Sequence, residues 1–188
     1  MSARHPERGV RTARQRGTGL IEVLVAIAVM SFGLLAVARL GASALLHQKA
    51  AQMRLTGVSL AQYYVERARL NVYGFDLGAY DIAFGATPAG SVPGLNADAP
   101  DTDAARNVAA ADRQAFLQLV AKALPEGAAE VVSRPSAQAR ELDIWLLWRD
   151  TSIDPANSLD GAARHACKKD LSESGRNGRS CMHWRVGL

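Results

Sequence analysis

The chain has 188 residues, and 22 lysines and arginines against 18 aspartates and glutamates give it a net charge of +4. The first 17 residues carry five arginines and one acid, so this N-terminal end accounts for the whole excess and the remainder is formally neutral. The composition therefore gives no basis for a nucleic-acid-binding surface, although a basic arm alone could suggest one.

An apolar segment follows the basic end. Residues 20–38 carry no charge except Glu22. At about 1.5 Å per residue, a helix over residues 20–39 is roughly 28 Å long, close to the thickness of a bilayer core. We therefore predict a membrane-spanning helix whose basic end stays in the cytoplasm and whose C-terminal side faces outward. Arg39, at the outer end of the span, is expected to extend to the lipid headgroups.

Three interpretations of this segment compete. A cleaved secretory signal is one, because Ala-Ser-Ala at residues 42–44 suits signal peptidase, but the apolar run is longer than usual and contains Glu22. A plain single-pass anchor explains the length but not the acid, which costs a few kcal/mol or more in lipid. A basic leader that ends in Gly17, followed by a retained apolar helix with one fixed acid, accounts for all of these features.

Residues 17–26, Gly-Thr-Gly-Leu-Ile-Glu-Val-Leu-Val-Ala, resemble the N-terminal motif of type IV prepilins. In that family a membrane protease, prepilin peptidase, cuts after the leader glycine and methylates the new N-terminal amine. The resemblance implies a cut between Gly17 and Thr18, N-methylation of Thr18, and Glu22 as the fifth mature residue. Gly17 suits the cut because a residue without a side chain lets the backbone enter a narrow cleft. Thr18 departs from the usual Phe or Met, and Arg39 stands where many major pilins have a proline.

Glu22 then has two interpretations. The resemblance implies that it meets the N-terminal amine of a neighbouring subunit during assembly, so that two charges that are each costly in lipid neutralise one another. Alternatively, Glu22 only complements the positive end of the helix dipole, which is worth about 0.3–1 kcal/mol.

The helix is expected to continue beyond the membrane, because no proline interrupts residues 18–71. Its second half has one apolar face at helical spacing, made of Leu46, Ala50, Met53, Gly57, Ala61, Tyr64 and Ala68. We expect it to end between Asn71 and Gly74. Residues 74–102 are rich in Gly, Pro, Ala and Asp and predict a long loop, whose acids lack the spacing of a calcium-binding loop.

A second helix is predicted over residues 103–123, with an apolar face of Phe116, Leu119, Val120, Ala123 and Leu124. Three strands are predicted over residues 129–133, 141–149 and 182–186, and the second is expected to be central because both of its faces are partly apolar. These elements predict an α+β fold of the type IV pilin kind, in which a long N-terminal helix packs on a small antiparallel sheet with one extra helix.

Cys167 and Cys181 have two interpretations. Outside the cytoplasm they are expected to form a disulfide, which would stabilise the fold by roughly 3 kcal/mol. Alternatively, with His165 and His183 they supply four zinc ligands, although one residue between paired ligands is fewer than structural zinc sites usually have. A C-terminal loop closed by a disulfide also resembles the one common in pilins.

No nucleotide-binding loop, hydrolase motif or carboxylate pair is visible, so we expect the substrate of an enzyme, not an enzyme, with no cofactor and no metal. The expected organisation is a cleaved leader (1–17), a transmembrane and assembly helix (18–45), its amphipathic continuation (46–72) and a periplasmic pilin domain (73–188).

Residues 16–40, with Ser-Phe-Gly-Leu-Leu at 31–35, resemble the minor pilins called PilV, or type IV pilus modification proteins. The sequence Trp-Arg-Asp at 148–150, before a tail with two cysteines, also fits that group. The resemblance implies an inner-membrane protein that joins other minor pilins in a priming or tip complex for the major pilin, and so supports pilus biogenesis and twitching motility. The alternatives are a GspI-like minor pseudopilin of a type II secretion system, and a membrane-anchored binding module or adhesin-associated subunit.

Overall fold

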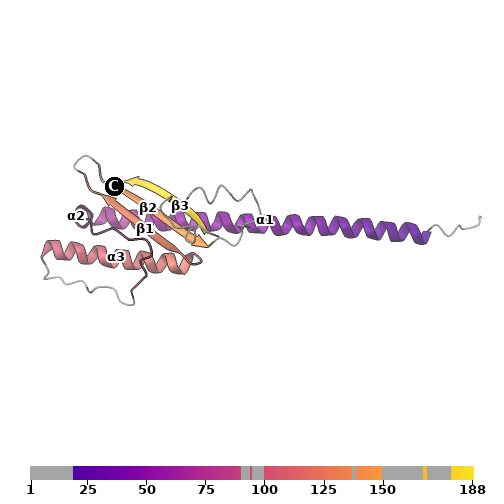
Figure 1. Cartoon of the computed structure of the whole chain (residues 1–188), viewed down its shortest axis with the longest axis horizontal. Helices are drawn as coiled ribbons and strands as arrows, with labels where there is room; N and C mark the ends of the chain where they lie inside the picture. Colours follow the sequence, from indigo (N-terminus) through magenta and orange to yellow (C-terminus); the bar gives the residue numbers. More distant parts are fainter. Residues whose placement is uncertain (1–18, 90–93, 95–99, 137–138, 150–166, 169–178) are drawn as a thin grey trace, which may run out of the picture. The chain divides into compact units, whose positions relative to one another are not determined.

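The computed structural model describes residues 19–89, 94, 100–136, 139–149, 167–168 and 179–188. These residues form three helices and three strands (Figure 1): α1 (Gly19–Leu70), α2 (Val72–Asp76), α3 (Asp101–Ala123), β1 (Ala128–Arg134), β2 (Glu141–Arg149) and β3 (Arg179–Gly187). The predicted α+β class, with a long N-terminal helix, a small antiparallel sheet and a further helix, is confirmed. The chain divides into two compact units, with the boundary between Leu45 and Leu46.

The N-terminal unit is described from Gly19 to Leu45 and consists of the first half of α1. Every large apolar side chain from Leu20 to Leu40 is at least 56% exposed. Among the described residues, α1 is the one helix whose length and composition would let it cross a membrane. Apolar exposure on all sides of a helix is unfavourable in water but suits a lipid environment.

The second unit is built on a three-stranded sheet. Its strand order is β1-β2-β3, and both pairs are antiparallel, so β2 is central as predicted. Strand β2 buries side chains on both faces, and Leu142, Ile144, Leu146 and Leu147 are all fully buried. The first and third strands are longer than predicted, because backbone pairing with β2 extends past the apolar residues on which the prediction rested.

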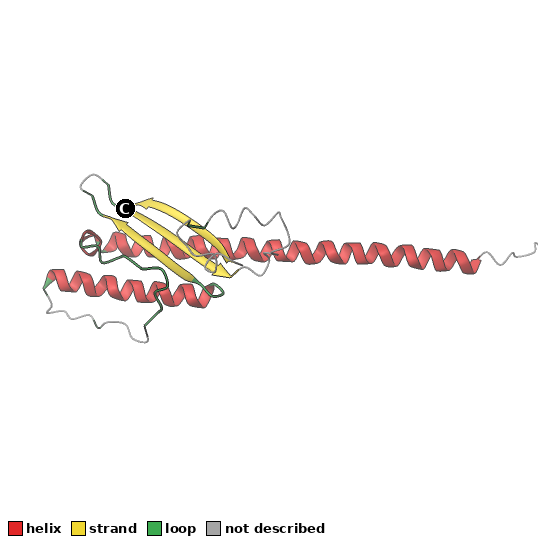
Figure 2. Cartoon of the chain, viewed as in Figure 1, coloured by secondary structure: helices red, strands yellow, loops and turns green. Residues whose placement is uncertain are grey.

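One core joins the inner face of the sheet to α3 and to the second half of α1 (Figure 2). Helix α1 approaches the sheet at Gly57, where an added Cβ would contact Met182 Cε and lie 3.7 Å from both Leu146 and Trp184. The small residue thus permits close packing. The largest fully buried side chains of this core are Trp148, Tyr64, Tyr80, Phe75 and Phe116.

The predicted apolar face of α1 needs two corrections. Leu46 is 47% exposed, whereas Leu60 and Val65, which the pattern left out, are buried. The buried face is therefore shorter at its N-terminal end and wider near the sheet, because the sheet and α3 both pack on this half of the helix.

The predicted loop after α1 is partly wrong. Asn71 ends α1 and caps α2, since its side-chain oxygen accepts a hydrogen bond of 3.1 Å from the Gly74 backbone N–H. Further along, Ile82 pairs with Val131 in an isolated antiparallel bridge. The prediction missed both elements because five helical residues and a single bridge leave no periodic pattern.

Helix α3 was predicted in nearly the right place, but its buried face was partly wrong. Leu119 is 38% exposed and Ala123 is exposed, whereas Asp112 is only 7% exposed. The buried face continues along the helix through Ala105 and Ala109. A hydrophobicity pattern could not include Asp112, which is buried because Tyr80 Oη donates a hydrogen bond of 2.8 Å to its carboxylate.

Candidate functional site

The first candidate site is the start of α1. Glu22 lies in the first turn of the helix, and its side chain has no ion pair or hydrogen bond with any residue that the structure describes. Its neighbours Ile21 and Val23 are apolar and 69% and 56% exposed. An acid without a partner, surrounded by side chains that favour lipid, needs a cation from outside the described part of the chain.

Gly17 and Thr18, the residues at the predicted cut, lie outside the described residues. The first described residue, Gly19, already begins α1, so Glu22 is held in a helix close to the predicted new N-terminus. Residues 42–44, where a signal peptidase would cut, lie well inside the same helix.

Arg39 is the other charged residue between Gly19 and Leu45. It lies about 25 Å along the helix axis from Glu22, at about 1.5 Å per residue, so the two charges of one chain do not meet. A hydroxyl in the same segment is satisfied internally, since Ser31 Oγ donates a hydrogen bond of 2.8 Å to the Ile27 carbonyl. Glu22 and Arg39 are the two charged side chains of this described segment, and they form no ion pair within it.

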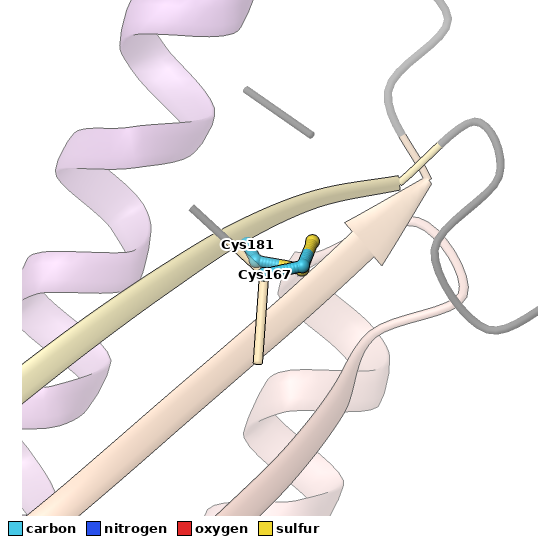
Figure 3. Close-up of a disulfide and its surroundings, with 2 residues drawn as sticks. All are labelled: Cys167 and Cys181. Carbon is cyan, nitrogen blue, oxygen red and sulfur yellow. A yellow bond between two sulfur atoms is a disulfide. The ribbon is translucent and has the colours of Figure 1, made fainter. Parts of the chain in front are cut away.

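The second candidate site is the cysteine pair. Cys167 and Cys181 form a disulfide with a Cα–Cα distance of 4.9 Å (Figure 3). Both cysteines pack against Leu147 on the outer face of the sheet, which is the face away from the core. Next to Cys167, Lys168 Nζ lies 2.7 Å from Glu130 of β1. The disulfide and this ion pair together fasten residues 167–168 across the outer face.

The zinc interpretation is wrong for the cysteines, because their sulfurs are bonded to each other. His165 lies outside the described residues. The His183 ring stacks on Trp145 at 4.2 Å between ring centroids, and its Nε2 lies 3.1 Å from Asp143. No group of three or more metal-binding side chains occurs among the residues whose positions are described.

Sequence reasoning missed a charged cluster on the same outer face. Asp143 of β2 has a side chain that is only 5% exposed, and Arg134 of β1 and Arg185 of β3 bind it at 2.7 and 2.8 Å. The hydrogen bond from Arg185 is the main cause that lowers the pKa of Asp143, burial opposes it, and His183 and Arg134 lower it further. The alternation of the strand placed Asp143 on this face, but the partners became visible only with the strand register.

The comparisons with known proteins concern the first site. The chain matches a family model described as the prokaryotic N-terminal methylation motif over residues 12–38. This range contains the predicted cut at Gly17 and Thr18, and it contains Glu22. No curated protein and no solved structure matches the chain.

The matched motif covers the N-terminal segment and leaves the second unit without a family match. It supports a type IV pilin-like protein and indicates a pilin or pseudopilin that is a substrate of prepilin peptidase. Together with the apolar half of α1 it fits membrane anchoring and incorporation into a pilus, and it suggests a structural, non-enzymatic role.

Proposed function

We propose that the chain is a minor type IV pilin of the PilV kind. In this proposal the leader 1–17 is removed, Thr18 becomes a methylated N-terminus, residues 18–45 form the membrane and assembly helix, and residues 46–72 continue it. Residues 73–188 form a periplasmic pilin domain. The protein then joins other minor pilins in a complex from which the major pilin polymerises, and it supports pilus biogenesis and twitching motility.

The observation that carries the proposal is the exposed Glu22 within the methylation motif. An ionised carboxylate in a lipid-facing helix is costly unless a cation neutralises it. Removal of the leader creates such a cation at Thr18, only four residues from Glu22 in sequence. The N-terminal amine of one subunit and Glu22 of the next can then neutralise each other. This pairing would favour the assembled state over the isolated subunit in the membrane.

Processing is tested by intact mass spectrometry of the full chain, expressed with and without prepilin peptidase. The expected product begins at Thr18 and carries one added methyl group, and it forms only when the peptidase is present. A Gly17→Ala variant should keep its leader, because the added Cβ obstructs the backbone at the cut. A cut after residue 44 in the wild type would instead support a secretory signal.

Membership of the pilus is tested separately from processing. Deletion of the gene should abolish surface pili and twitching while protein secretion continues, and the mature chain should be recovered from sheared pili. Loss of secretion with intact pili would identify a GspI-like pseudopilin instead. A processed chain that affects neither would support a membrane-anchored binding module.

A further inference from the structure

The strand β3 has an outer edge with no strand partner among the described residues. The directions in which its backbone N–H and C=O groups point can be inferred from β1, at the other edge of the sheet. There Val131 and Ile82 each donate a backbone hydrogen bond of 2.9 Å to the other. Val131 therefore points its N–H and C=O away from β2, and its partner Ile144 points its own toward β3. Trp184, which is opposite Ile144, is thus bonded to β2.

Because backbone directions alternate along a strand, His183 and Arg185 turn their N–H and C=O groups outward. Two hydrogen bonds agree with this assignment. The Gly187 carbonyl points in the same direction as these groups, and it accepts a hydrogen bond of 3.1 Å from Arg69, which lies outside the sheet. The Leu188 N–H points in the opposite direction, and it donates a hydrogen bond of 2.8 Å to the Arg140 carbonyl. The outward groups of His183 and Arg185 are therefore placed to pair with a further strand.

The two edges of the sheet differ. On the β1 edge, Ile82 pairs with Val131, and the Asp81 carboxylate accepts a hydrogen bond of 2.6 Å from the Ser133 N–H. These contacts protect that edge in the way that natural sheets usually protect theirs. On the β3 edge, Arg69 contacts the Gly187 carbonyl, and no described residue bonds the outward backbone groups of His183 and Arg185. An open strand edge is a template for pairing with another chain.

A groove runs beside the open edge on the side of α1. Its volume is about 440 Å³, and its apolar wall consists of Val58, Ala61 and Val65 of α1 and Trp184 and Val186 of β3. The ion pair between Glu66 and Arg69, at 2.8 Å, lies along its polar side. A strand added to β3 would direct every second side chain into this groove.

The remaining side chains of an added strand would lie on the outer face of the sheet. Here β3 presents His183 and Arg185, which share the acid Asp143 with Arg134, and Arg179, whose guanidinium lies 3.6 Å from Glu126. Arg185 has a side chain that is 52% exposed. Around Asp143 two arginines therefore share one carboxylate, and this part of the outer side favours acidic side chains in a neighbour.

We propose that the β3 edge binds an extended segment of a partner protein in which apolar and acidic residues alternate. The strand β2 shows that this pattern fits, because it already pairs with the other side of β3. Leu142 of β2 lies opposite Val186 on the inner face, and Asp143 lies opposite Arg185 on the outer face. A second copy of β3 fits less well, since antiparallel pairing of two such strands would bring their arginines and histidines together.

This inference goes beyond the proposed function and does not depend on N-terminal processing. It is tested with the full chain in lipid nanodiscs and the synthetic peptide acetyl-ELDIELD-amide, which repeats the alternation of residues 141–144. Fluorescence polarisation measures binding of a labelled peptide, and hydrogen exchange measures backbone protection. We expect saturable binding and new protection of the amides of His183 and Arg185.

Two control peptides separate the parts of the proposal. Acetyl-KLKIKLK-amide keeps the apolar residues but reverses the charges, and it should bind at least about tenfold more weakly at low salt. Acetyl-ELDPELD-amide has a proline in the middle, which cannot donate a backbone hydrogen bond, and it should not protect the edge. Equal binding of all three peptides would show non-specific adhesion and overturn the proposal.

Two variants of the protein test the location. Val58→Glu places a charge in the groove and should weaken binding of the acidic peptide by at least about tenfold. Leu119→Glu, which adds the same charge at a 38% exposed apolar site on α3, should leave binding unchanged. If Val58→Glu does not fold, the peptide controls still decide the outcome. Protection of the His183 and Arg185 amides in the free protein, by its own chain or by a second copy, would overturn the proposal.

Discussion

Asp143 and Arg185 face each other across β2 and β3, with Arg185 Nε 2.8 Å from Oδ1 and Nη2 3.2 Å from Oδ2 of the carboxylate. Arg134 approaches the same carboxylate from β1 at 2.7 Å. One acid therefore binds side chains of both outer strands to the central strand. Because the carboxylate is buried and the two guanidinium groups are about half exposed, removing the acid leaves two cations that can still reach water.

The first prediction concerns pH. The pKa of Asp143 is lower in the folded protein than its ordinary value, mainly because Arg185 donates to it. The stability that this acid contributes is therefore fully present above its unfolded pKa, about 3.9, and is lost as the pH falls through the lower folded value. Thermal unfolding of the full chain, followed by tryptophan fluorescence, should show a Tm that decreases at acidic pH.

The control for this prediction is Asp143→Asn. The substitution should lower the free energy of unfolding at neutral pH by about 1–3 kcal/mol, because Arg185 and Arg134 lose a charged acceptor. It should also make the Tm less dependent on pH in the acidic range. An equal acid dependence in the two proteins would show that another carboxylate is responsible.

The second prediction concerns the disulfide. Replacing both Cys167 and Cys181 with serine should lower the free energy of unfolding by about 3 kcal/mol, the value that chain entropy gives for a loop of this length. The loss should also expose Leu147, which the two cysteines cover. Chemical unfolding in detergent measures the difference. A reducing agent should destabilise the wild type to the level of the double variant and leave the double variant unchanged.

The third prediction concerns Gly127, in the turn between α3 and β1. A Cβ added there would lie 2.5 Å from the Val120 carbonyl oxygen and 3.0 Å from the Leu124 carbonyl oxygen. Backbone atoms cannot move aside as the end of a side chain can, so Gly127→Ala should destabilise the fold by about 1–3 kcal/mol. Gly94→Ala is the control, because a Cβ at Gly94 has no neighbour within 4 Å. Similar Tm values for the two variants would contradict this close approach.

The fourth prediction concerns a buried tyrosine. Tyr64 of α1 is fully buried and donates a hydrogen bond of 2.7 Å from its hydroxyl to the Tyr80 carbonyl. Tyr64→Phe should cost about 1–2 kcal/mol of unfolding free energy, because the carbonyl loses this donor inside the core. Tyr73→Phe removes an exposed hydroxyl that lies 3.1 Å from Thr102 Oγ1 and should change stability by less than about 0.5 kcal/mol. Equal losses of unfolding free energy in the two variants would contradict a stabilising role of the buried hydrogen bond.

The fifth prediction concerns Glu22. Glu22→Ala should leave membrane insertion intact, since it removes a charge from an apolar helix, but it should reduce recovery of the chain in sheared pili. Ser31→Ala is a matched control in the same helix, because the Ser31 hydroxyl bonds to the Ile27 carbonyl of its own helix. Immunoblots of membranes and pili measure both quantities. Normal incorporation of the Glu22→Ala chain into pili would contradict the proposed role of Glu22 in assembly.

Local sequence was sufficient for most elements of the fold. The long helix α1, the helix α3 and the central strand follow from periodicity and breaker residues, which are properties of neighbouring residues. The N-terminal segment was the easiest to interpret. A charge within an apolar span and a glycine at the end of a basic leader are visible without any tertiary contact.

Tertiary structure alone decided which polar groups meet. Asp143 acquires Arg185 and Arg134 only when β2 pairs in one register with both neighbours. Asp112 is buried where Tyr80 and Arg67 reach its carboxylate from other parts of the chain. The edge of β3 that has no strand partner in the described part of the chain depends on strand order in the same way. Each of these features joins residues far apart in the chain, and hydrophobic pattern specifies how a segment is buried without specifying its partner. The sequence by itself therefore determined most of the elements and the motif, while the fold determined the pairings and which strand edge lacks a partner among the described residues.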